Sequence, residues 1–388
     1  MPLRRLCHAH IHLDKCYLLS QCDDLQTGDF AEALRVTAKA KAAFPSRLRD
    51  LYDRGKRFII ESVQCGVTAM RAHVEVDKTV HTCCLDTGLK LKDEFRAICD
   101  VQICVFAQDP LFDHEADEHP GENYNLLREA VTREGVQAVG SAPYVEPTTE
   151  QARRNIDLVL QMAYAQKLHA DFHLDYNLDA STEPLIWYLL QQVRQRKKTG
   201  EWHDGAHVCV GHATRLSLFS TEEWARYHAM VEGDELPVTL VGLPPSDMYM
   251  MGRGLPGRPR ATLNVPRLAK EYGVGVGMAV NNVENAFTPQ GVVDPLALCP
   301  LGVAVFQDGT EMGCRTLIEA VTITARVAIA ARGPTSLTPI AGDPADFVLL
   351  HENDSVSSAA LNPSYARTVI KDGQIVAARH ADKWIQIV

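Results

Sequence analysis

Short apolar runs alternate along the chain with longer amphipathic stretches, and this alternation limits the possible folds more than any other feature. A strand, an amphipathic helix and a second strand form the unit of a parallel sheet. The apolar runs lie at residues 7–12, 67–75, 101–107, 137–142, 168–174, 206–211, 237–242 and 274–280. The amphipathic stretches include Asp29–Ala43, Leu51–Cys65, Thr149–Gln166, Pro184–Lys198, Ser220–Val231 and Leu263–Tyr272. Eight such strands over about 330 residues predict an α/β fold, a (β/α)8 TIM barrel with insertions.

An open, doubly wound α/β sheet is the alternative arrangement of the same elements. Sheets of that type often bind a dinucleotide at a glycine-rich turn. The candidate turn here, residues 273–277 (GVGVG), lacks the third glycine of the dinucleotide fingerprint and lies within an expected strand. We therefore favour the closed barrel.

The composition is that of a globular protein, with 46% hydrophobic and 23% charged residues. The net charge of −10 argues against a nucleic-acid partner. No apolar run approaches the roughly 20 residues that span a bilayer, so we expect no membrane partner. The 11 cysteines show no zinc-knuckle spacing, and no apolar leader precedes the first histidines. We expect reduced thiols in a cytoplasmic protein.

Histidines stand at the expected C-terminal ends of several strands. His10 and His12 end the first strand two residues apart, so strand alternation points both imidazoles to one side. His173 and His212 end the fifth and sixth strands, and His73 lies on the second. Active sites of TIM barrels form at these ends, and neutral imidazoles ligate divalent metals. The pattern indicates a metal centre at the barrel mouth. The alternative is a structural barrel in which these histidines only hydrogen-bond one another.

Seven short motifs, in order and at barrel spacing, make the chain similar to the amidohydrolase superfamily, and within it to the cytosine-deaminase-like hydrolases. They are residues 10–15 (HIHLDK), 71–76 (RAHVEV), 104–108 (CVFAQ), 140–146 (GSAPYVE), 172–175 (FHLD), 211–214 (GHAT) and 251–253 (MGR). The resemblance runs from His8 to about Gly373. It implies one divalent metal ion, zinc or iron. It also implies hydrolysis of a C–N bond in a small cyclic amide, amino-heterocycle or lactam.

The resemblance also implies roles for single residues at the metal. In the family, two histidines of the first strand, the histidine of the fifth strand and an aspartate of the eighth strand hold the ion. This implies His10, His12 and His173 as ligands, with Asn281 at the aspartate position. The histidine of the sixth strand, here His212, orients the metal-bound water. An imidazole beside that water can also hold its proton.

The expected substrate-binding residues are Gln108, Asn282, Phe287, Arg71, His73 and Tyr176. Gln108 and Phe287 match family positions that hydrogen-bond and cover the substrate ring. Arg71 would bind a substrate carboxylate or neutralise Glu75 or Asp109. His73 would line the pocket or form a hydrogen-bonded core group. We expect His8 to share the face of the first ligands in a structural role, and Asp14 and Lys15 to form a buried ion pair at the mouth.

Two positions depart from the family pattern, and each change removes an anion. Tyr176 stands where the family has its acid/base glutamate, and Asn281 stands where the family has its metal-binding aspartate. Tyrosine, with an ordinary pKa of about 10, is a poor base, and hard cations favour carboxylates over amides. We expect Asp175, two residues after His173, to point inward and replace the catalytic base, or else to orient a ligand histidine. Asp247 and Glu284, on the loops after the seventh and eighth strands, are the alternative carboxylates for that role. The alternative is a catalytically silent barrel that still binds a small molecule.

Residues 338–388 form a separate expected unit after a barrel of residues 1–337. Asp372 and Gly373, between two β-rich runs, predict a hairpin turn. The segment resembles the C-terminal half of the small β-sandwich that accompanies the family's barrel. The strands that precede the first histidines in the family are not found ahead of His8, so we expect an incomplete sandwich. Its open edge or apolar face favours a homo-oligomer.

Overall fold

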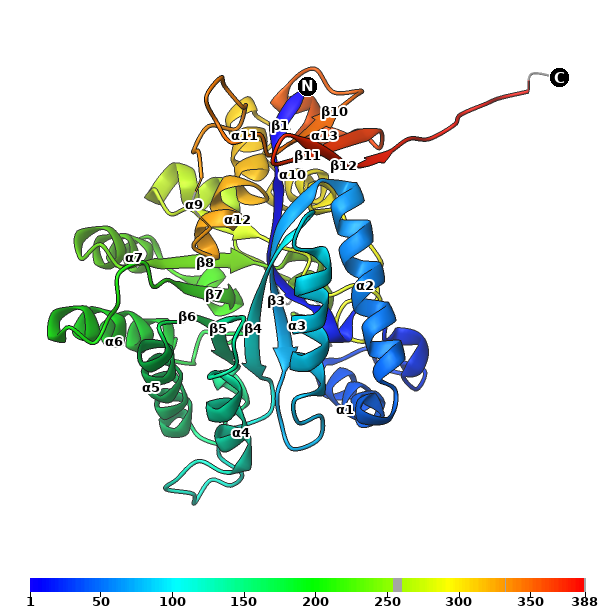
Figure 1. The fold of residues 1–388 in the computed structure, drawn as a ribbon. Coiled ribbons are helices and arrows are strands. Elements are labelled where there is room, and N and C mark those ends of the chain that lie inside the picture. The colour runs from blue at the N-terminus through cyan, green and yellow to red at the C-terminus, as the bar shows by residue number, and fades with distance from the viewer. Residues whose placement is uncertain (254–259, 332, 387–388) are drawn as a thin grey trace.

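The structure is a computed structural model that describes residues 1–253, 260–331 and 333–386. Eight parallel strands follow one another around a barrel in chain order (Figure 1). They are β2 (Leu6–His12), β3 (Val67–Glu75), β4 (Asp100–Ala107), β5 (Val136–Ser141), β6 (His169–Leu174), β7 (Val208–His212), β8 (Val238–Gly242) and β9 (Val276–Met278). A parallel bridge between Ile11 and Asn281 joins the two ends of this order. The expected (β/α)8 barrel is confirmed, and the doubly wound sheet is wrong.

The helices surround the barrel, except for the last one, α13, which lies at the end of the molecule near the N-terminus (Figure 1). They are α1 (Phe30–Lys41), α2 (Leu48–Cys65), α3 (Cys83–Phe95), α4 (Glu122–Ala130), α5 (Thr149–Gln166), α6 (Ile186–Thr199), α7 (Thr221–Gly233), α8 (Pro244–Met250), α9 (Val265–Tyr272), α10 (Leu298–Phe306), α11 (Glu311–Ala320), α12 (Ile323–Ala328) and α13 (Val356–Leu361). The six helices expected from the sequence all form. Among the helices of the described ranges, none combines the length and the apolar character needed to cross a membrane.

Local sequence explains where such a helix begins and ends, as α5 shows. The side chain of Thr148 accepts a hydrogen bond from the backbone of Gln151 at its start, and Lys167 in the left-handed conformation ends it. Ile156 and Val159 on its inner face are buried against the strands. Burial of such a side chain contributes about 1.5–3 kcal/mol. The apolar face thus holds the helix on the barrel and fixes the strand ends that it connects.

A second, antiparallel sheet is built from β1 (Pro2–Arg4), β10 (Phe347–Leu350), β11 (Arg367–Lys371) and β12 (Gln374–Arg379), in the order β1-β10-β11-β12. The hairpin turn expected at Asp372 and Gly373 is confirmed, and both residues have the positive φ that such a turn needs. Because β1 pairs with β10, residues 2–4 belong to this sheet. The division after residue 337 stays a prediction. Figure 1 shows the sheet at one end of the molecule, with the C-terminal residues leading away from it.

Candidate metal centre

The histidines from the strand ends meet inside the barrel. The ring centroids of His10 and His173 lie 4.3 Å apart, those of His10 and His12 5.4 Å, and those of His173 and His212 5.3 Å. β2 supplies the first two of these residues, β6 supplies His173 and β7 supplies His212. All four side chains are buried. The expected convergence of imidazoles from three strands is confirmed.

Most nitrogens of these rings have no hydrogen-bond partner in the described protein. Neither nitrogen of His10 has one, and the Nδ1 atoms of His12 and His173 have none. The Nε2 atoms of His12 and His173 lie 2.9 Å apart. A buried polar atom without a partner costs about 1–3 kcal/mol. Burial holds the pKa of all three imidazoles well below the ordinary value, so they are neutral. Neutral, unpartnered imidazoles are the donors that a divalent metal requires, and these residues therefore fit one.

Asn281 lies beside these histidines, three residues after the end of β9 and bridged to Ile11 of β2. Its Nδ2 donates a hydrogen bond to Ser246 Oγ at 2.7 Å. Its Oδ1 is buried and has no partner among the described residues. The amide orientation is thus fixed by Ser246, and the oxygen is left free for a ligand. This arrangement is compatible with the expected neutral fourth ligand, whose role stays a prediction.

A buried carboxylate holds His212. The Nδ1 atom lies 3.0 Å from Asp247 Oδ1, while Asp247 Oδ2 accepts hydrogen bonds from the backbone of Leu243 at 3.0 Å and from the Thr262 hydroxyl at 2.7 Å. The ring of Tyr176 packs on the imidazole with centroids 3.8 Å apart. Burial raises the pKa of Tyr176 well above its ordinary value, so its hydroxyl stays protonated. Because Nδ1 faces Asp247, Nε2 is the nitrogen left for the pocket.

A cavity of about 20 Å³ adjoins the histidines, enough space for one water molecule or ion. It is lined by His12, Lys15, Phe30, Gln108, Tyr144, His173, Tyr176, His212, Asn281, Asn282 and Phe287. Four of the expected substrate-binding residues are therefore in place, namely Gln108, Asn282, Phe287 and Tyr176. Neither aspartate nor glutamate belongs to this lining in the described residues.

Lys15 lines the pocket, whereas we expected a buried ion pair of Asp14 and Lys15 at the mouth in preference to direct chemistry. Its Nζ instead donates to Glu75 Oε1 at 2.5 Å and to Gln108 Oε1 at 3.1 Å. Asp14 accepts the backbone N–H of Glu75 at 2.7 Å. Although burial raises the pKa of Glu75, Lys15 and Lys41 lower it to about 2. The charged carboxylate therefore fixes the ammonium at the pocket wall. The position of Lys15 three residues after His12 is a signal that points to this location.

Four aromatic side chains close the pocket. The ring of Phe30 lies 5.8 Å from Tyr176, 5.8 Å from Phe287 and 6.1 Å from Tyr144, measured between centroids. Phe30 is the first residue of α1, which no barrel motif marks. Tyr144 lies within the motif at residues 140–146, so its place at the pocket could have been predicted. Phe30 has no sequence signal of that kind.

Proteins of known structure share this fold over nearly their whole length. The 5-methylcytosine deaminase from Klebsiella pneumoniae, liganded with phosphonocytosine, matches 100% of this chain and 89% of its own, with a TM-score of 0.86 and 18% identity. The N-isopropylammelide isopropylaminohydrolase from Burkholderia multivorans ATCC 17616 matches 97% and 87%, with a TM-score of 0.76 and 22% identity. The chain therefore shares the (β/α)8 barrel fold of these two proteins.

Two further comparisons, one of structure and one of sequence, point to related names. The atrazine chlorohydrolase from Arthrobacter aurescens TC1, complexed with zinc, matches 97% of the chain and 83% of its own, with a TM-score of 0.64 and 14% identity. The N-isopropylammelide isopropyl amidohydrolase of Pseudomonas sp. (strain ADP) is 29% identical over 126 residues, which is 31% of this chain and 28% of that protein. The chain thus matches less than a third of this relative's length. No family model matches the chain.

Asp175 does not line the pocket beside the histidines. It follows the end of β6 with a φ of 52°, so strand alternation no longer applies to it. Its carboxylate accepts hydrogen bonds from the backbone of Leu185 at 2.8 Å and of Ile186 at 3.0 Å, at the start of α6. The expected inward orientation is wrong.

Arg71 and His73 lie on β3, deeper in the barrel than the pocket. Arg71 Nη1 donates to Asp171 Oδ2 at 2.8 Å, and Arg71 Nε donates to Gln102 Oε1 at 2.6 Å. His73 Nε2 lies 3.2 Å from Asp171 Oδ1. All three of Arg71, His73 and Asp171 are fully buried. Neither Arg71 nor His73 lines the cavity beside the histidines, and their expected contact with substrate stays a prediction. Asp171 neutralises Arg71, whereas the sequence analysis expected Glu75 or Asp109 in that role.

His8 lies on the opposite side of β2 from His10. Its ring packs 5.3 Å from that of Phe58 on α2, and its Nε2 lies 3.3 Å from Ser62 Oγ. The pairing of β2 with β3 shifts register between His8 and Ile11. Such an irregularity changes the face to which the preceding residues point. The expected shared face is therefore wrong.

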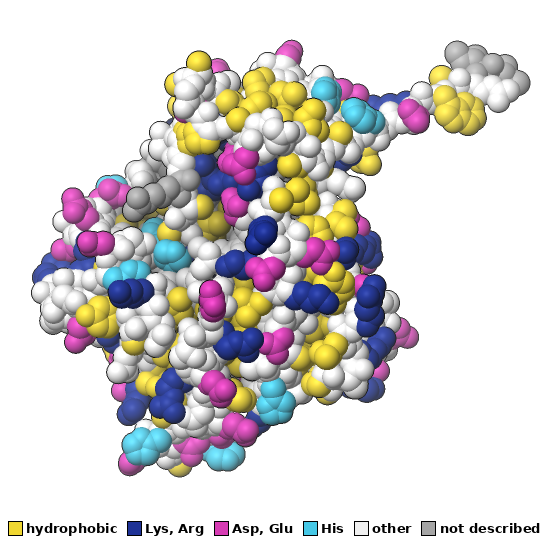
Figure 2. Space-filling view, viewed as in Figure 1, with side chains coloured by type: hydrophobic (Ala, Val, Ile, Leu, Met, Phe, Trp, Pro, Cys, Tyr) yellow, Lys and Arg dark blue, Asp and Glu magenta, His cyan; other side chains and the backbone are white. Residues whose placement is uncertain are grey.

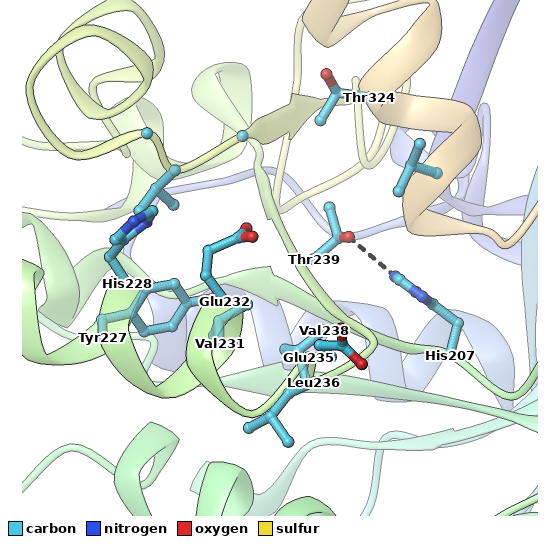
Figure 3. Close-up of a pocket in the computed structure, with 14 residues that line it drawn as sticks. His207, Tyr227, His228, Val231, Glu232, Glu235, Leu236, Val238, Thr239 and Thr324 are labelled. Carbon is cyan, nitrogen blue, oxygen red and sulfur yellow. Dashed lines mark hydrogen bonds between the residues drawn. The ribbon is translucent and has the colours of Figure 1, made fainter. Parts of the chain in front are cut away.

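A larger cavity of about 450 Å³ lies at the opposite end of the barrel (Figure 3). Its walls come from α7 and from the starts of the neighbouring strands. His207 Nε2 is hydrogen-bonded there to Thr239 Oγ1 at 2.9 Å, and the carboxylates of Glu232 and Glu235 are on exposed residues. Within the described chain, no side chain of this wall is a buried polar group without a partner. The cavity lacks the donor set that distinguishes the metal centre.

Proposed function

We propose that the chain is a metal-dependent hydrolase that cleaves a C–N bond in a small amino-heterocycle, cyclic amide or lactam. The observation that carries the proposal is the set of buried, unpartnered imidazoles from β2 and β6 beside a histidine held by a carboxylate. The names of similar proteins support it, since they include a deaminase, an isopropylaminohydrolase and an amidohydrolase. A bound divalent ion would supply a water of lowered pKa, near 7. The zinc of the chlorohydrolase structure favours zinc over iron.

Residues of the chain would bind the metal ion and transfer the proton of the attacking water. His10, His12 and His173 would hold the ion. Nε2 of His212 takes a proton from the attacking water and delivers it to the leaving nitrogen. Asp247 holds Nδ1 and stabilises the imidazolium that forms. The pair thus performs the proton transfer for which the family uses the glutamate that Tyr176 replaces.

Two amides would orient the substrate ring. Oε1 of Gln108 accepts a hydrogen bond from Lys15, and Oδ1 of Asn282 accepts one from Asn285 at 2.7 Å. The amide nitrogens are therefore the groups left to donate hydrogen bonds to ring carbonyl or ring nitrogen acceptors. A six-membered ring is larger than a cavity of about 20 Å³, so the pocket has to widen when substrate enters.

The proposal is tested with full-length protein purified without chelators. Ammonia or amine release is measured over a panel of aminopyrimidinones, amino-triazines and lactams, together with metal content. We expect turnover of at least one member, and His173→Ala should lose both metal and turnover. His228→Ala, in the opposite cavity, is the matched control and should keep both. A metal-loaded protein that hydrolyses none of the panel contradicts the proposal. The comparisons give no support to the silent barrel.

A cytoplasmic location is part of the same proposal. All 11 cysteines are free, and nine of them are buried. Free thiols persist in reducing compartments. The proposed partners are a small-molecule substrate and a second copy of the chain.

A further inference from the structure

Another cavity, of about 300 Å³, lies at the end of the barrel where the strands begin. Its walls include Ala69, Asp100 and Gln137, near the starts of β3, β4 and β5. The imidazoles of the metal centre come from the opposite ends of the strands. The cavity is therefore separate from the proposed active site, and the proposed function makes no use of it.

The walls of this cavity carry more positive than negative charge. Arg5, Lys92 and Arg96 are cations, and Asp100 is the carboxylate among the described lining residues. Asp100 is already paired, because its Oδ2 lies 2.8 Å from Arg5 Nη1 and its Oδ1 lies 3.2 Å from Lys371 Nζ. The chain as a whole has a net charge of −10, so an excess of cations is not a general feature of its surface. Lys92 and Arg96 are left without a balancing charge at this cavity.

Lys92, on α3, is held in place by neutral groups. Its Nζ donates to the carbonyl oxygen of Gly135 at 2.7 Å and to Gln137 Oε1 at 2.5 Å. No carboxylate of the described chain forms an ion pair with it. Partial burial lowers the pKa of this ammonium, because the surroundings compensate its charge poorly. The third N–H of the ammonium is left for a further acceptor.

Arg96 supplies a second cation to the same cavity. It follows α3 directly, four residues after Lys92, so the two side chains lie on one face of the last helical turn. Its guanidinium is exposed and has neither a hydrogen bond nor an ion pair within the described ranges. Oε1 of Gln137 also accepts the backbone N–H of Ile103 at 3.3 Å, so Nε2 of that amide is left to donate. Three donors, two of them charged, thus border one cavity.

The remaining wall is mainly apolar. It includes the side chains of Ala69, Val101, Ile329 and Ala331. Both ends of the Gln102 amide are occupied, since Oε1 accepts from Arg71 Nε at 2.6 Å and Nε2 donates to the carbonyl oxygen of Ile329 at 3.1 Å. A cavity of about 300 Å³ is at the lower limit of the usual small-molecule sites. It is larger than an inorganic anion needs, and the apolar wall suits an organic group.

We propose that this cavity binds a small organic phosphate. Lys92, Arg96 and Nε2 of Gln137 would donate to the phosphate oxygens, and the apolar wall would cover the organic group. A phosphate monoester carries about 1.5 to 2 negative charges at pH 7, which the two unbalanced cations match. Hydrogen bonds from charged donors to phosphate are roughly twice as strong as those between neutral groups. The site does not depend on the proposed hydrolysis.

Isothermal titration calorimetry of the full-length protein with phenyl phosphate tests the proposal at low ionic strength, where charge interactions are least screened. We expect one site at which Lys92→Met and Arg96→Gln each weaken binding by about 10-fold or more. Lys198→Met and Arg154→Gln, at exposed cations on α6 and α5, are the matched controls and should stay within about twofold of wild type. No binding by the wild type, or an equal loss in the controls, overturns the proposal. Arg96→Gln changes an exposed side chain, so its result decides the matter if thermal unfolding shows that Lys92→Met does not fold.

Further titrations identify the class of ligand and the place where it binds. Inorganic phosphate should bind about 10-fold more weakly than phenyl phosphate, because the phenyl ring adds buried apolar area. Benzoate, with the same ring and a single charge, should also bind about 10-fold more weakly. Equal affinity of either compound with phenyl phosphate overturns the assignment to an organic phosphate. His173→Ala should bind phenyl phosphate as the wild type does. Loss of binding in that variant would place the ligand at the metal centre and overturn the inference, whereas failure of the proposed hydrolysis would leave it standing.

Discussion

At the scale of single residues, the contact between His212 and Asp247 allows the proposed proton transfer to be tested separately from metal binding. Asp247 holds Nδ1 of the imidazole but ligates nothing in the metal centre. We expect Asp247→Asn to lower kcat about 100-fold, in the range of general acid–base effects. KM and zinc content should change little. Steady-state kinetics with metal analysis check this, and an unchanged kcat would mean that His212 transfers no proton.

The two departures from the family pattern lead to a second prediction at this scale. Tyr176→Glu combined with Asn281→Asp restores a carboxylate beside His212 and one beside the first ligands. A carboxylate near the attacking water accepts protons that a buried tyrosine with a raised pKa does not. We expect deamination of an aminopyrimidinone to rise at least 10-fold in kcat/KM, measured by ammonia release. The single variants are the controls, and no gain in the double variant contradicts the proposed relation to deaminases.

At the scale of secondary-structure elements, Asp175 acts on helix α6. Its carboxylate accepts two backbone N–H groups at the start of the helix, which have no partner inside the helix itself. We expect Asp175→Ala to lower the free energy of unfolding by about 2 kcal/mol. kcat/KM should stay within about twofold of wild type. Urea unfolding and kinetics test both.

Ser220→Ala is the matched control for this variant. Ser220 caps α7 through a capping box at an exposed position far from the pocket. Its loss should cost about 1 kcal/mol without any kinetic effect. If Asp175→Ala reduces kcat far more than stability, the residue takes part in catalysis after all.

The elements were predictable from sequence because their patterns are local. The apolar runs of all eight barrel strands and the amphipathic stretch of α5 mark the elements with few errors. Side-chain direction failed where the backbone leaves its regular repeat. His8 lies before a register shift in β2, and Asp175 follows a strand end with positive φ. Neither the register shift in β2 nor the positive φ of Asp175 can be recognised from the amino-acid sequence.

The candidate site was predictable where residues stand at strand ends. His10, His173 and His212 meet as expected, because parallel strands of a barrel deliver their ends to one place. The depth at which each side chain lies within the barrel could not be predicted. Arg71 and Asp171 form an internal ion pair that joins β3 to β6, and only the closed structure shows which strand positions share a layer.

At the scale of the whole molecule, the second sheet favours self-association. β12 is one of its two edge strands, and Ile375 on that strand is 72% exposed. Figure 2 shows hydrophobic side chains gathered at the end of the molecule where this sheet lies. An unpaired edge with exposed apolar residues pairs readily with a second copy. We expect a dimer by light scattering after size exclusion and a shift to monomer in Ile375→Lys. A wild-type monomer at micromolar concentration contradicts this expectation.

The acid stability of the molecule depends on histidines that folding buries. Burial lowers the pKa of His8 from an ordinary value near 6.5 to about 3. Between pH 6.5 and pH 3 the unfolded chain therefore binds a proton at this residue that the folded chain does not. Stability then falls as pH falls through this window. At about 1.4 kcal/mol per pH unit, the loss from His8 alone is roughly 3 kcal/mol between pH 6.5 and pH 4.

His8 suits this measurement because it packs against Phe58 and Ser62, away from the metal centre. Urea unfolding of metal-free protein between pH 4 and pH 7 removes the contribution of metal loss. We expect His8→Gln to reduce the fall of unfolding free energy with decreasing pH by about the share that His8 contributes. Glutamine does not titrate, and its amide can hydrogen-bond Ser62 as the imidazole does. His119→Gln, at an exposed position, should keep the wild-type slope. Equal slopes for wild type and His8→Gln would show that the imidazole escapes burial before the chain unfolds, through local opening between β2 and α2.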